Sequence, residues 1–346
     1  MKVLLIGGTG FIGPHVAAAL LAHGHQVVVF HRGNSDVPAG TNETIGDRRR
    51  LSAHSSDLRA LRPDVVIDVI LSSGSQASEL MAVFQGSTGR VVAVSSCDVY
   101  RACGITHGLE EGPLEPLPLT ESSALRTKLQ TYPAAQVEML QQVFGWLDAE
   151  YDKIPVEREI LGHARVPATV VRLPMVYGPG DPLHRFQPVV KRVLDGRRRI
   201  PMSAEMAGWR ATKAYVEDVG AAIALAATSD RAAGRIYNVG ERDALTELEW
   251  ARLIARALHW QGEFRLVPDA VLPPPLRAPG NTAQQWVTDT SRIRTELGFA
   301  EAVPRDEAVR RTVEWEATNP PAGFTPYVFD YEAEDAALTA TESVRD

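Results

Sequence analysis

The sequence predicts an α/β fold in which a doubly wound parallel sheet carries helices on both faces. Short apolar runs alternate with helical patterns from residue 2 to residue 95, as expected for parallel strands joined by crossover helices. The run at 65–70 is almost continuously apolar, which is typical of a strand buried on both faces. A glycine-rich turn links the first strand to the first helix, and this arrangement is typical of dinucleotide-binding sheets of the Rossmann type.

The glycine-rich turn runs from Gly7 to Gly13, between a strand at 2–6 and a helix at 14–24 that leads to a second strand at 26–30. We expect Gly7 to make the tight turn, Gly10 to let the backbone approach a pyrophosphate, and Gly13 to let the helix pack on the strand. The free N–H groups at the helix start then face the phosphates. The strand-turn-helix context disfavours the alternative, a glycine turn without a ligand.

Composition limits the partners and the compartment. At 346 residues the chain is long enough for one large domain or two moderate ones, and its 45% apolar content supports a sizeable core. The net charge of −7 disfavours binding to nucleic acid through bulk electrostatics. Cys97 and Cys103 form no disulfide framework, so we expect a cytoplasmic protein. No signal peptide precedes the first strand and no apolar run has the length of a membrane span, so no membrane partner is expected.

The end of the second strand bears on the choice of cofactor. NAD-selective folds place an acid there to bind the ribose 2′-hydroxyl, whereas this chain has His31 followed by Arg32. No acid repels a 2′-phosphate at this position, and a guanidinium can bind one. We therefore expect NAD(P) as cofactor, leaning towards NADP. The alternative is a solvated Arg32 without a ligand.

The rest of the chain contains further strands and helices around two irregular stretches. Strands are expected at 65–70, 90–95, 168–173 and 235–239. Helices are expected at 51–61, 76–85, 134–149, 156–163, 186–194, 215–227, 248–258 and 308–318. Residues 101–133 are rich in Gly, Pro and Glu, and we expect a long loop over the cofactor cleft. Residues 268–285 are rich in proline and are expected to be irregular.

These elements predict two domains and a tail. Residues 1–178 form a dinucleotide-binding domain whose sheet is completed by about 209–240. Residues 179–208 and 241–331 form a smaller α+β substrate domain. Residues 332–346 are acidic and alanine-rich, so we expect a tail with a disordered end.

Five segments together carry a resemblance to a known superfamily. They are Gly7–Gly13, Ser95–Tyr100, Arg172–Gly180, Tyr215–Val219 and Tyr237–Gly240. With them, about residues 1–318 resemble the extended short-chain dehydrogenase/reductase superfamily, in its NAD-dependent epimerase/dehydratase type. The His-Arg-Gly after the second strand and the Asp-Val-Tyr-Arg run resemble a bacterial branch related to chloroplast stem-loop-binding proteins.

The resemblance implies a nicotinamide cofactor in the N-terminal domain and, in many relatives, a nucleotide-sugar in the C-terminal domain. It implies that Ser96, four residues before Tyr100, polarises the reacting oxygen, and that Asp98 matches the proton-abstracting base of the sugar dehydratases. The acid that precedes this base in those enzymes is Cys97 here, so the dehydratase pair is not intact. The resemblance also implies a homodimer formed through a helix pair.

The Tyr-x-x-x-Lys element of the family is altered in this chain. A tyrosine and a lysine four residues apart share one helix face, where the lysine cation lowers the phenol pKa and holds the ribose. If Tyr151 is in register, the lysine position is Pro155; if Lys153 is in register, the tyrosine position is Ala149. We prefer Lys153, because Lys153–Glu157 matches the family's lysine, three apolar residues and glutamate.

Tyr151 can still serve if it lies before the helix rather than within it. Proline inside a helix costs about 3 kcal/mol but is tolerated in the first turn. With Asp152 as N-cap and Pro155 in the first turn, the helix starts after Tyr151. The Tyr151 side chain is then free of helical spacing and could fold back over the cofactor. The alternative is a packing tyrosine on a loop.

Further contacts follow from the resemblance. Asp47 matches an acid that contacts adenine; the alternative is a loop carboxylate near Arg48 and Arg49. Arg210 matches an arginine that binds the substrate phosphate; the alternative is a surface ion pair. The run at 197–199 is interpreted as a solvated face rather than a diphosphate site. No metal site is expected, since the histidines show no ligand spacing. The residues expected to bind cofactor are Gly7, Thr9, Gly10, Phe11, Ile12, Gly13, His31, Arg32, Asp47, Leu71, Lys153, Pro174 and Val176.

The sequence therefore predicts an enzyme, an NAD(P)-dependent oxidoreductase or epimerase/dehydratase. It would act by hydride transfer on a secondary alcohol or ketone centre of a sugar, nucleotide-sugar or nucleoside-like substrate. Ser96 orients the oxygen, Lys153 holds the ribose, and Tyr151 or Asp98 moves the proton. The alternative is an atypical member that keeps the nucleotide site but acts as a sensor or RNA-binding protein. The displaced tyrosine favours this alternative, and the net charge weighs against RNA.

Overall fold

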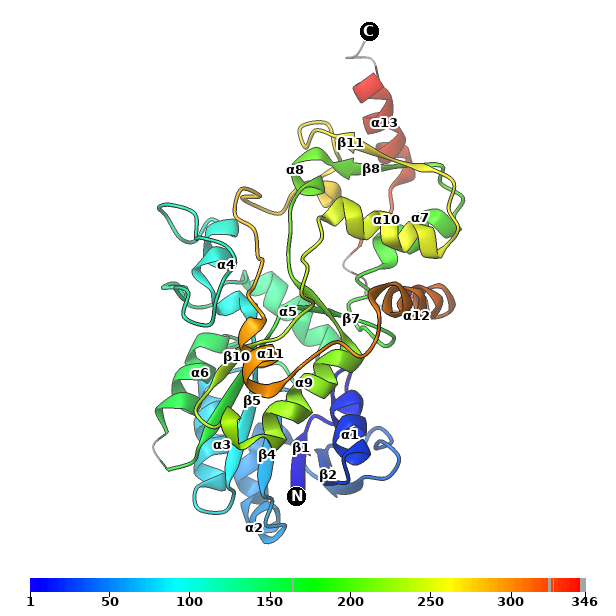
Figure 1. Cartoon of the computed structure of the whole chain (residues 1–346). Coiled ribbons are helices and arrows are strands. Elements are labelled where there is room, and N and C mark those ends of the chain that lie inside the picture. The colour runs from blue at the N-terminus through cyan, green and yellow to red at the C-terminus, as the bar shows by residue number, and fades with distance from the viewer. Residues whose placement is uncertain (164, 323–324, 326, 343–346) are drawn as a thin grey trace.

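The fold is built on one seven-stranded sheet. The computed structural model describes residues 1–346 apart from 164, 323–324, 326 and 343–346. The strands of this sheet are β1 (Lys2–Ile6), β2 (Gln26–His31), β3 (Asn42–Ile45), β4 (Val65–Asp68), β5 (Arg90–Ser96), β6 (Ala168–Leu173) and β10 (Ile236–Asn238). They lie in the order β10-β6-β5-β4-β1-β2-β3, and all neighbouring pairs are parallel (Figure 1). The predicted doubly wound α/β fold is confirmed.

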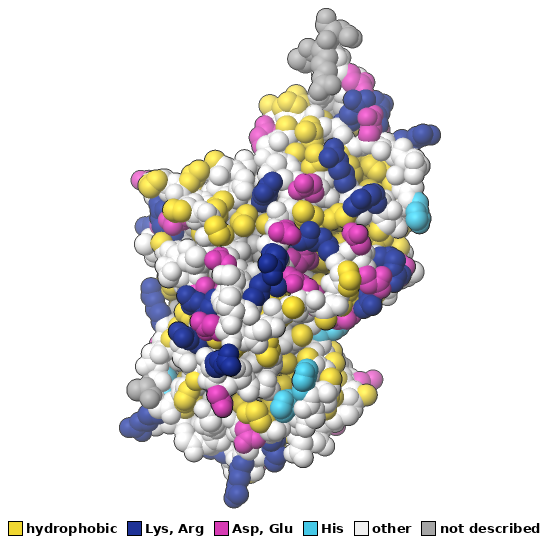
Figure 2. Space-filling model, viewed as in Figure 1, with side chains coloured by type: hydrophobic (Ala, Val, Ile, Leu, Met, Phe, Trp, Pro, Cys, Tyr) yellow, Lys and Arg dark blue, Asp and Glu magenta, His cyan; other side chains and the backbone are white. Residues whose placement is uncertain are grey.

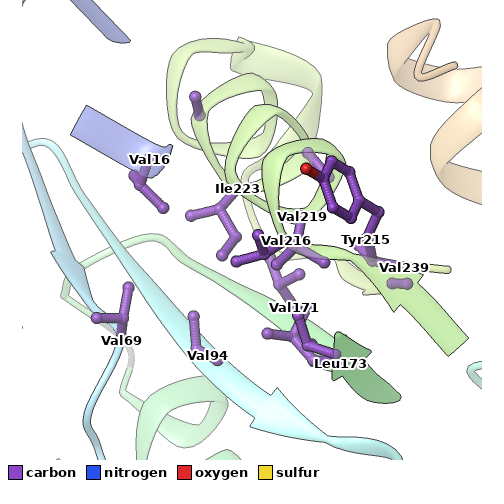
Figure 3. Packing of buried hydrophobic residues seen from close by; sticks show 14 of the residues in the cluster. Val16, Val69, Val94, Val171, Leu173, Tyr215, Val216, Val219, Ile223 and Val239 are labelled. Atoms are coloured by element: carbon purple, nitrogen blue, oxygen red, sulfur yellow. The ribbon is translucent and has the colours of Figure 1, made fainter. Parts of the chain in front are cut away.

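Two helices cover one face of the sheet. Alternate residues of each strand point to opposite faces, and Val3 and Leu5 of β1 belong to an apolar cluster with α1 (Gly13–Ala22) and α9 (Val216–Thr228). Figure 3 shows this packing, with Ile223 of α9 turned towards the side chains of the sheet. The cluster buries both helices against the strands, and it fixes the start of α1 at the end of β1.

The other face of the sheet is covered by a second group of helices, which includes the helix that carries Lys153. Leu4 and Ile6 of β1 point to this side and pack in a second buried cluster. Its helices are α2 (Ser55–Ala60), α3 (Gly74–Phe84) and α6 (Lys153–Gly162), preceded in the chain by the 3₁₀ segment η1 (Arg48–His54). The α6 helix lies against β5 and β6, so its first residues come close to the carboxyl ends of these strands.

A smaller group of elements lies beyond the carboxyl edge of the sheet, in the upper part of Figure 1. It contains two parallel strand pairs, β7 (Met175–Tyr177) with β9 (Lys213–Tyr215) and β8 (Arg199–Ser203) with β11 (Glu263–Val267). Thr246 and Glu249 form a capping box that starts α10. The helices of this group are α7 (Gln187–Leu194), α8 (Ala204–Ala207), α10 (Glu247–Ala257) and α12 (Arg305–Thr318).

Some connecting segments differ from the prediction. The stretch 101–133 begins with a short helix, α4 (Arg101–Thr106), because its apolar residues are buried beneath the loop that follows. The predicted helix at 134–149 is shorter, α5 (Ala134–Val143), and ends just before Gly145. A helix that the pattern did not predict, α11 (Ser291–Leu297), follows the proline-rich stretch. The rest of 107–133 is irregular, as expected.

The acidic C-terminal segment is a docked helix over its described part, α13 (Tyr331–Glu342). Glu334 is 1% exposed and forms an ion pair with the buried Arg192 of α7. Leu338 packs with Val267 of β11. A carboxylate that finds a buried guanidinium can be held in the interior, which explains why an acidic segment docks here. The predicted disordered end at 343–346 lies outside the described residues.

The run at 197–199 is therefore not simply a solvated face. Arg197 pairs with Asp335 and Arg199 pairs with Glu342, both on α13. Elsewhere on the face shown in Figure 2, basic and acidic side chains are interspersed. Within the described residues, no helix has the length and apolar character needed to cross a membrane.

Candidate active site

The glycine turn after β1 is sterically closed at Gly7, Gly8 and Gly13 and open at Gly10. Gly7 has φ +85°, and a Cβ there would lie 2.6 Å from Cγ2 of Ile70. A Cβ on Gly13 would lie 2.3 Å from the carbonyl oxygen of Gly7. On the exposed Gly10, the nearest atom to a Cβ would be 3.9 Å away. A Cβ on Gly8 would lie 2.7 Å from Cγ1 of Val29, so the fold requires three glycines for packing and leaves free space over Gly10.

The open space over Gly10 fits a pyrophosphate. The α1 helix starts at Gly13 with a proline in its first turn, where no intrahelical N–H bond is lost. Pro14 has no N–H, and the N–H of His15 donates to the carbonyl of Ile12 at 3.1 Å. The N–H of Gly13 and the positive end of the dipole are therefore what the helix start offers an anion. Thr9, Phe11 and Ile12 are half-buried in the same turn. The residues present therefore fit the diphosphate of a dinucleotide, as the sequence predicts.

The end of β2 is occupied by an internal hydrogen bond. The buried His31 lies 2.8 Å, from Nε2 to Oε2, from Glu43 of the neighbouring β3. Arg32 follows and is exposed. The sequence reveals no acid at the strand end, and the structure brings one close from β3, where it is held by His31. The Arg32 guanidinium stays accessible from solvent.

Asp47 is tied to its own loop. It caps η1 by accepting from the backbone N–H of Arg49 at 3.0 Å, and its carboxylate also pairs with the Arg49 guanidinium at 3.1 Å. The hydrogen bond from Arg49 lowers the pKa of Asp47. Arg48 turns inward instead and binds the buried Asp68 at 2.7 Å. This geometry matches the loop-carboxylate alternative for Asp47, and the adenine contact stays a prediction.

The predicted start of α6 is confirmed. Asp152 is the N-cap and accepts from the N–H of Ile154 at 2.8 Å, so Pro155 lies in the first turn, where it is tolerated. Lys153 is 5% exposed, and its Nζ donates to the carbonyl oxygens of Leu71 and, at 3.1 Å, Val94. An ammonium has three protons to donate, so one is left for a ligand. Burial lowers the pKa of Lys153 to about 8.

The buried lysine makes stability depend on pH. The pKa of Lys153 in the folded chain, about 8, lies below its ordinary value of 10.5. Between these values the unfolded chain binds a proton that the folded chain does not, so the free energy of unfolding rises with pH across this window. We expect denaturant unfolding to show a steeper rise above pH 8 for the natural chain than for Lys153→Met. Equal slopes in the two proteins would contradict a buried charge at this position.

One carboxylate oxygen of Asp98 accepts hydrogen bonds from two tyrosine hydroxyls. Tyr151 donates its hydroxyl proton to Oδ2 of Asp98 at 3.2 Å, and Tyr132 does the same at 3.3 Å. Oδ1 of Asp98 is buried and has no hydrogen-bond partner among the described residues. Nζ of Lys153 lies 5.7 Å from the centre of the Tyr151 ring. The tyrosine that precedes the helix thus does fold back, onto Asp98 and beside Lys153.

The pKa values of Asp98 and of the two tyrosines that donate to it are all raised. Burial raises the pKa of Asp98. Burial, followed by the charge of Asp98, raises the pKa values of Tyr151 and Tyr132 well above 10. The expectation that a lysine cation lowers the phenol pKa is therefore wrong for Tyr151. Protons are held on the phenols, and the carboxylate is their acceptor.

Ser96 lies at the end of β5, opposite Leu173 of β6. Its Oγ accepts from the backbone N–H of Asp98 at 3.2 Å and so caps the short turn η2 (Cys97–Val99). The hydroxyl proton remains available to a substrate oxygen. Burial raises the pKa of Cys97, which keeps it a thiol rather than a thiolate.

Two residues of the site could not be found from the sequence. Tyr132 lies at the end of the irregular stretch, and no spacing links it to Asp98. Arg126 is 2% exposed, donates to the backbone carbonyl of Asp98, and pairs with Asp152 at 3.2 Å. It joins the Asp98 turn to the N-cap of α6. An isolated arginine in a proline-rich stretch gives no signal for such a position.

Behind the site, a buried polar network holds α6 to the sheet. Arg172 of β6 binds Glu157 of α6 at 2.6 Å and donates to the hydroxyl of Tyr100 at 3.0 Å. Tyr100 in turn donates to Oδ1 of Asn238 on β10 at 2.6 Å. Ser95 donates to Glu157 at 2.6 Å. The network spans β5, β6, β10 and α6 and fixes the helix that carries Lys153.

The remaining predicted contacts lie around this centre. Pro174 connects β6 to β7, and Val176 lies within β7. Leu71 is buried after β4 and offers its carbonyl to Lys153. Arg210 is exposed, and its backbone forms a β-bridge with Thr246. The described residues contain no cluster of three or more potential metal ligands.

The fold and the open glycine turn define a dinucleotide-binding protein of the Rossmann type, with a Ser-Lys-Tyr-Asp group at the carboxyl edge of its sheet. A profile of the NAD dependent epimerase/dehydratase family matches residues 3–240. The chain belongs to that family, and it is an enzyme of the extended short-chain dehydrogenase/reductase type. The family's cofactor is a nicotinamide dinucleotide, which agrees with the turn after β1.

Individual relatives agree with this assignment. The chain is 28% identical to a 2′-dehydrokanamycin reductase of Streptomyces kanamyceticus over 76% of its own length and 67% of the relative. It is 26% identical to a dTDP-glucose 4,6-dehydratase of Streptomyces niveus over 92% and 94%. Over 33% of its length and 34% of the relative it is 30% identical to a chloroplast stem-loop binding protein of Arabidopsis thaliana.

A solved structure shows the same fold. The dTDP-glucose 4,6-dehydratase of Bacillus anthracis in complex with NAD superposes with a TM-score of 0.66 at 16% identity, over 92% of this chain and 97% of the other. The resemblance inferred from the five sequence segments is confirmed.

Proposed function

We propose that the chain is an NAD(P)-dependent oxidoreductase or epimerase/dehydratase acting by hydride transfer at a secondary alcohol or ketone centre. The substrate class is a sugar, nucleotide-sugar or nucleoside-like molecule, and the likeness to a dTDP-glucose 4,6-dehydratase supports it. One observation carries the proposal. A single edge of the sheet holds both the open glycine turn after β1 and the buried group of Lys153, Tyr151 and Asp98.

Each residue has a distinct task in this proposal. The backbone around Gly10 and the start of α1 bind the pyrophosphate, and the remaining proton of Lys153 Nζ binds the ribose. Ser96 donates to the substrate oxygen and orients it. When bound, the nicotinamide dinucleotide accepts hydride from the substrate carbon or gives hydride to it. Pro174 and Val176 line the nicotinamide side through their backbone.

The proton follows the hydrogen bonds towards Asp98. In oxidation, the substrate O–H bond breaks as its proton passes to the hydroxyl oxygen of Tyr151, while the proton of Tyr151 passes to Oδ2 of Asp98. A raised carboxylate pKa suits a base that works near neutral pH. A raised phenol pKa suits a relay and disfavours a resting phenolate. We therefore assign Asp98 as the proton acceptor and Tyr151 as the group that contacts substrate.

The finer assignments are part of the same proposal. NADP is favoured because Arg32 is exposed and Glu43, which the structure brings to the end of β2, is engaged by His31. Asp47 and Arg210 keep their proposed contacts with adenine and with a substrate phosphate. The division into a dinucleotide-binding part and a substrate part, a homodimer, and a cytoplasmic location complete the proposal.

Gly10→Ala tests the cofactor site. The added methyl group meets no protein atom nearer than 3.9 Å, so we expect the free energy of unfolding to change by less than about 0.5 kcal/mol. The methyl group takes up space needed by the pyrophosphate. We therefore expect the dissociation constants of NAD and NADP, measured by calorimetric titration, to rise by about tenfold or more.

Gly162→Ala is the matched control. A Cβ at this position meets no atom of the described residues within 4 Å, and Gly162 lies at the far end of α6 from Lys153. We expect unchanged dinucleotide binding. Equal dinucleotide affinities in Gly10→Ala and the natural chain would contradict the proposed cofactor site.

A panel of nucleotide sugars and nucleosides, followed at the absorbance band of the reduced nicotinamide, then tests the reaction. A silent panel with tight RNA retention would favour the RNA-binding alternative.

A further inference from the structure

The smaller group of elements encloses a cavity that the proposed chemistry does not use. Its volume is about 300 Å³, and it lies between α7, α10, β8 and β11. This size is at the lower end of the range of small-molecule pockets. Its wall is mainly apolar and aromatic and includes Phe186, Met202, Met206, Trp250, Ile254 and Phe264.

The charged side chains in the wall neutralise one another or a neighbour. Arg185 pairs with Asp181 at 2.6 Å, and Arg192 pairs with Glu334 of α13. Lys213 pairs with Glu247, which is itself part of the wall. The described lining thus offers no unpaired cation. Burying a diphosphate without a counter-charge is unfavourable, so this cavity is poorly suited to a nucleoside diphosphate.

One donor in the wall lacks an acceptor. Trp250 is 2% exposed, and its indole Nε1 is buried without a hydrogen-bond partner among the described residues. Its ring packs edge-on against Tyr177, with 5.2 Å between ring centres. A buried N–H group is normally paired, because leaving it unpaired is costly. The Nε1 atom has almost no accessible surface, so a molecule in the cavity meets the carbon atoms of the Trp250 ring and not this N–H group.

The strand β7 links the wall of the cavity to the end of β6, at the edge of the sheet where Ser96 lies. Tyr177 lines the cavity and follows Leu173, the last residue of β6, by four positions. Four residues span about 14 Å at most, and Leu173 is the register partner of Ser96. Tyr177 in the cavity wall therefore lies within this distance of the register partner of Ser96.

We propose that this cavity binds an uncharged apolar or aromatic group, and that this group is the distal part of the substrate. The second half rests on the proposed function and narrows it: the substrate carries hydroxyl or ketone groups at one end and a neutral apolar group at the other. The cationic side chains of the cavity wall are already paired with carboxylates, so the cavity does not accommodate a nucleoside diphosphate.

The cavity is tested with Prodan, a neutral aromatic ketone whose emission shifts to the blue in apolar surroundings. We expect a saturable blue shift with the natural chain and no displacement by excess UDP. Ile254→Trp fills the cavity, and Met202→Trp fills it from another wall should the first variant fail to fold. Each is expected to weaken Prodan binding about tenfold or more.

Three results would overturn the proposal: no saturable shift, displacement of Prodan by UDP, or equal Prodan binding in folded cavity-filling variants. Dinucleotide titration of the same proteins tests the proposed function separately. If NAD and NADP fail to bind while Prodan does, the proposed function fails and the cavity assignment stands. For the substrate class, methylumbelliferyl glucoside should bind the holoenzyme about tenfold more tightly than UDP-glucose. The reverse order would contradict the proposed class.

Discussion

Replacing Asp98 with asparagine is expected to lower kcat for hydride transfer by about 10²- to 10⁴-fold, the usual contribution of a general base. Asp98 accepts from both Tyr151 and Tyr132 through one oxygen. An asparagine oxygen still accepts these hydrogen bonds, but it cannot take up a proton. The same substitution removes a charge that raises both phenol pKa values, so both should fall, which spectrophotometric titration of tyrosinate measures without any substrate.

The two phenols supply a matched control for this prediction. They lie at nearly equal distances from the same Asp98 oxygen, 3.2 Å for Tyr151 and 3.3 Å for Tyr132. If only Tyr151 contacts substrate, Tyr151→Phe should lose activity almost as strongly as Asp98→Asn, and Tyr132→Phe should lose much less. Full activity in Tyr151→Phe would remove this tyrosine from the proton path. Full activity in Asp98→Asn would leave Tyr151 without its assigned acceptor.

Local signals in the sequence predicted the parts of the site that depend on local backbone geometry. The glycine turn is specified by steric limits at Gly7 and Gly13, which the structure shows directly. The start of α6 is specified by Asp152 as N-cap and by Pro155, which is tolerated only in a first turn. These constraints operate over a few residues, so a pattern in the chain is enough to recognise them.

The remaining features depend on partners far apart in the chain. Tyr132 and Arg126 come from an irregular stretch, and only tertiary packing brings them to Asp98. The acidic α13 docks because Glu334 meets the buried Arg192, which lies 142 positions away. Composition alone cannot identify such a partner.

The sign of the phenol pKa shift depended on the same kind of contact. The family pattern places a lysine next to a tyrosine, which lowers the phenol pKa. In this chain the closest charged group to the Tyr151 hydroxyl is the carboxylate of Asp98, which receives its hydrogen bond. The Lys153 ammonium lies over the Tyr151 ring, 5.7 Å from the ring centre. The tyrosine therefore serves as a donor to a base, and the base is assigned to Asp98.

Arg172→Met is expected to lower the free energy of unfolding by about 3–5 kcal/mol, the usual loss when one partner of a buried ion pair is removed. Arg172 is 1% exposed and Glu157 is 3% exposed. Without the guanidinium, the hydroxyl of Ser95 is the one side-chain donor that remains to the Glu157 carboxylate among the described residues. Urea unfolding at neutral pH measures the loss.

Two further variants separate the buried charge from the loss of packing. In Arg172→Met with Glu157→Met, no charge is left unpaired, so most of the lost stability should return. Lys191→Met breaks an exposed pair with Asp195 of 2.7 Å, and such pairs contribute less than about 1 kcal/mol. A loss in Arg172→Met no larger than in Lys191→Met would contradict the network. Because Glu157 lies one turn after Lys153 on α6, dinucleotide affinity should fall with stability in Arg172→Met and recover with it in the double variant.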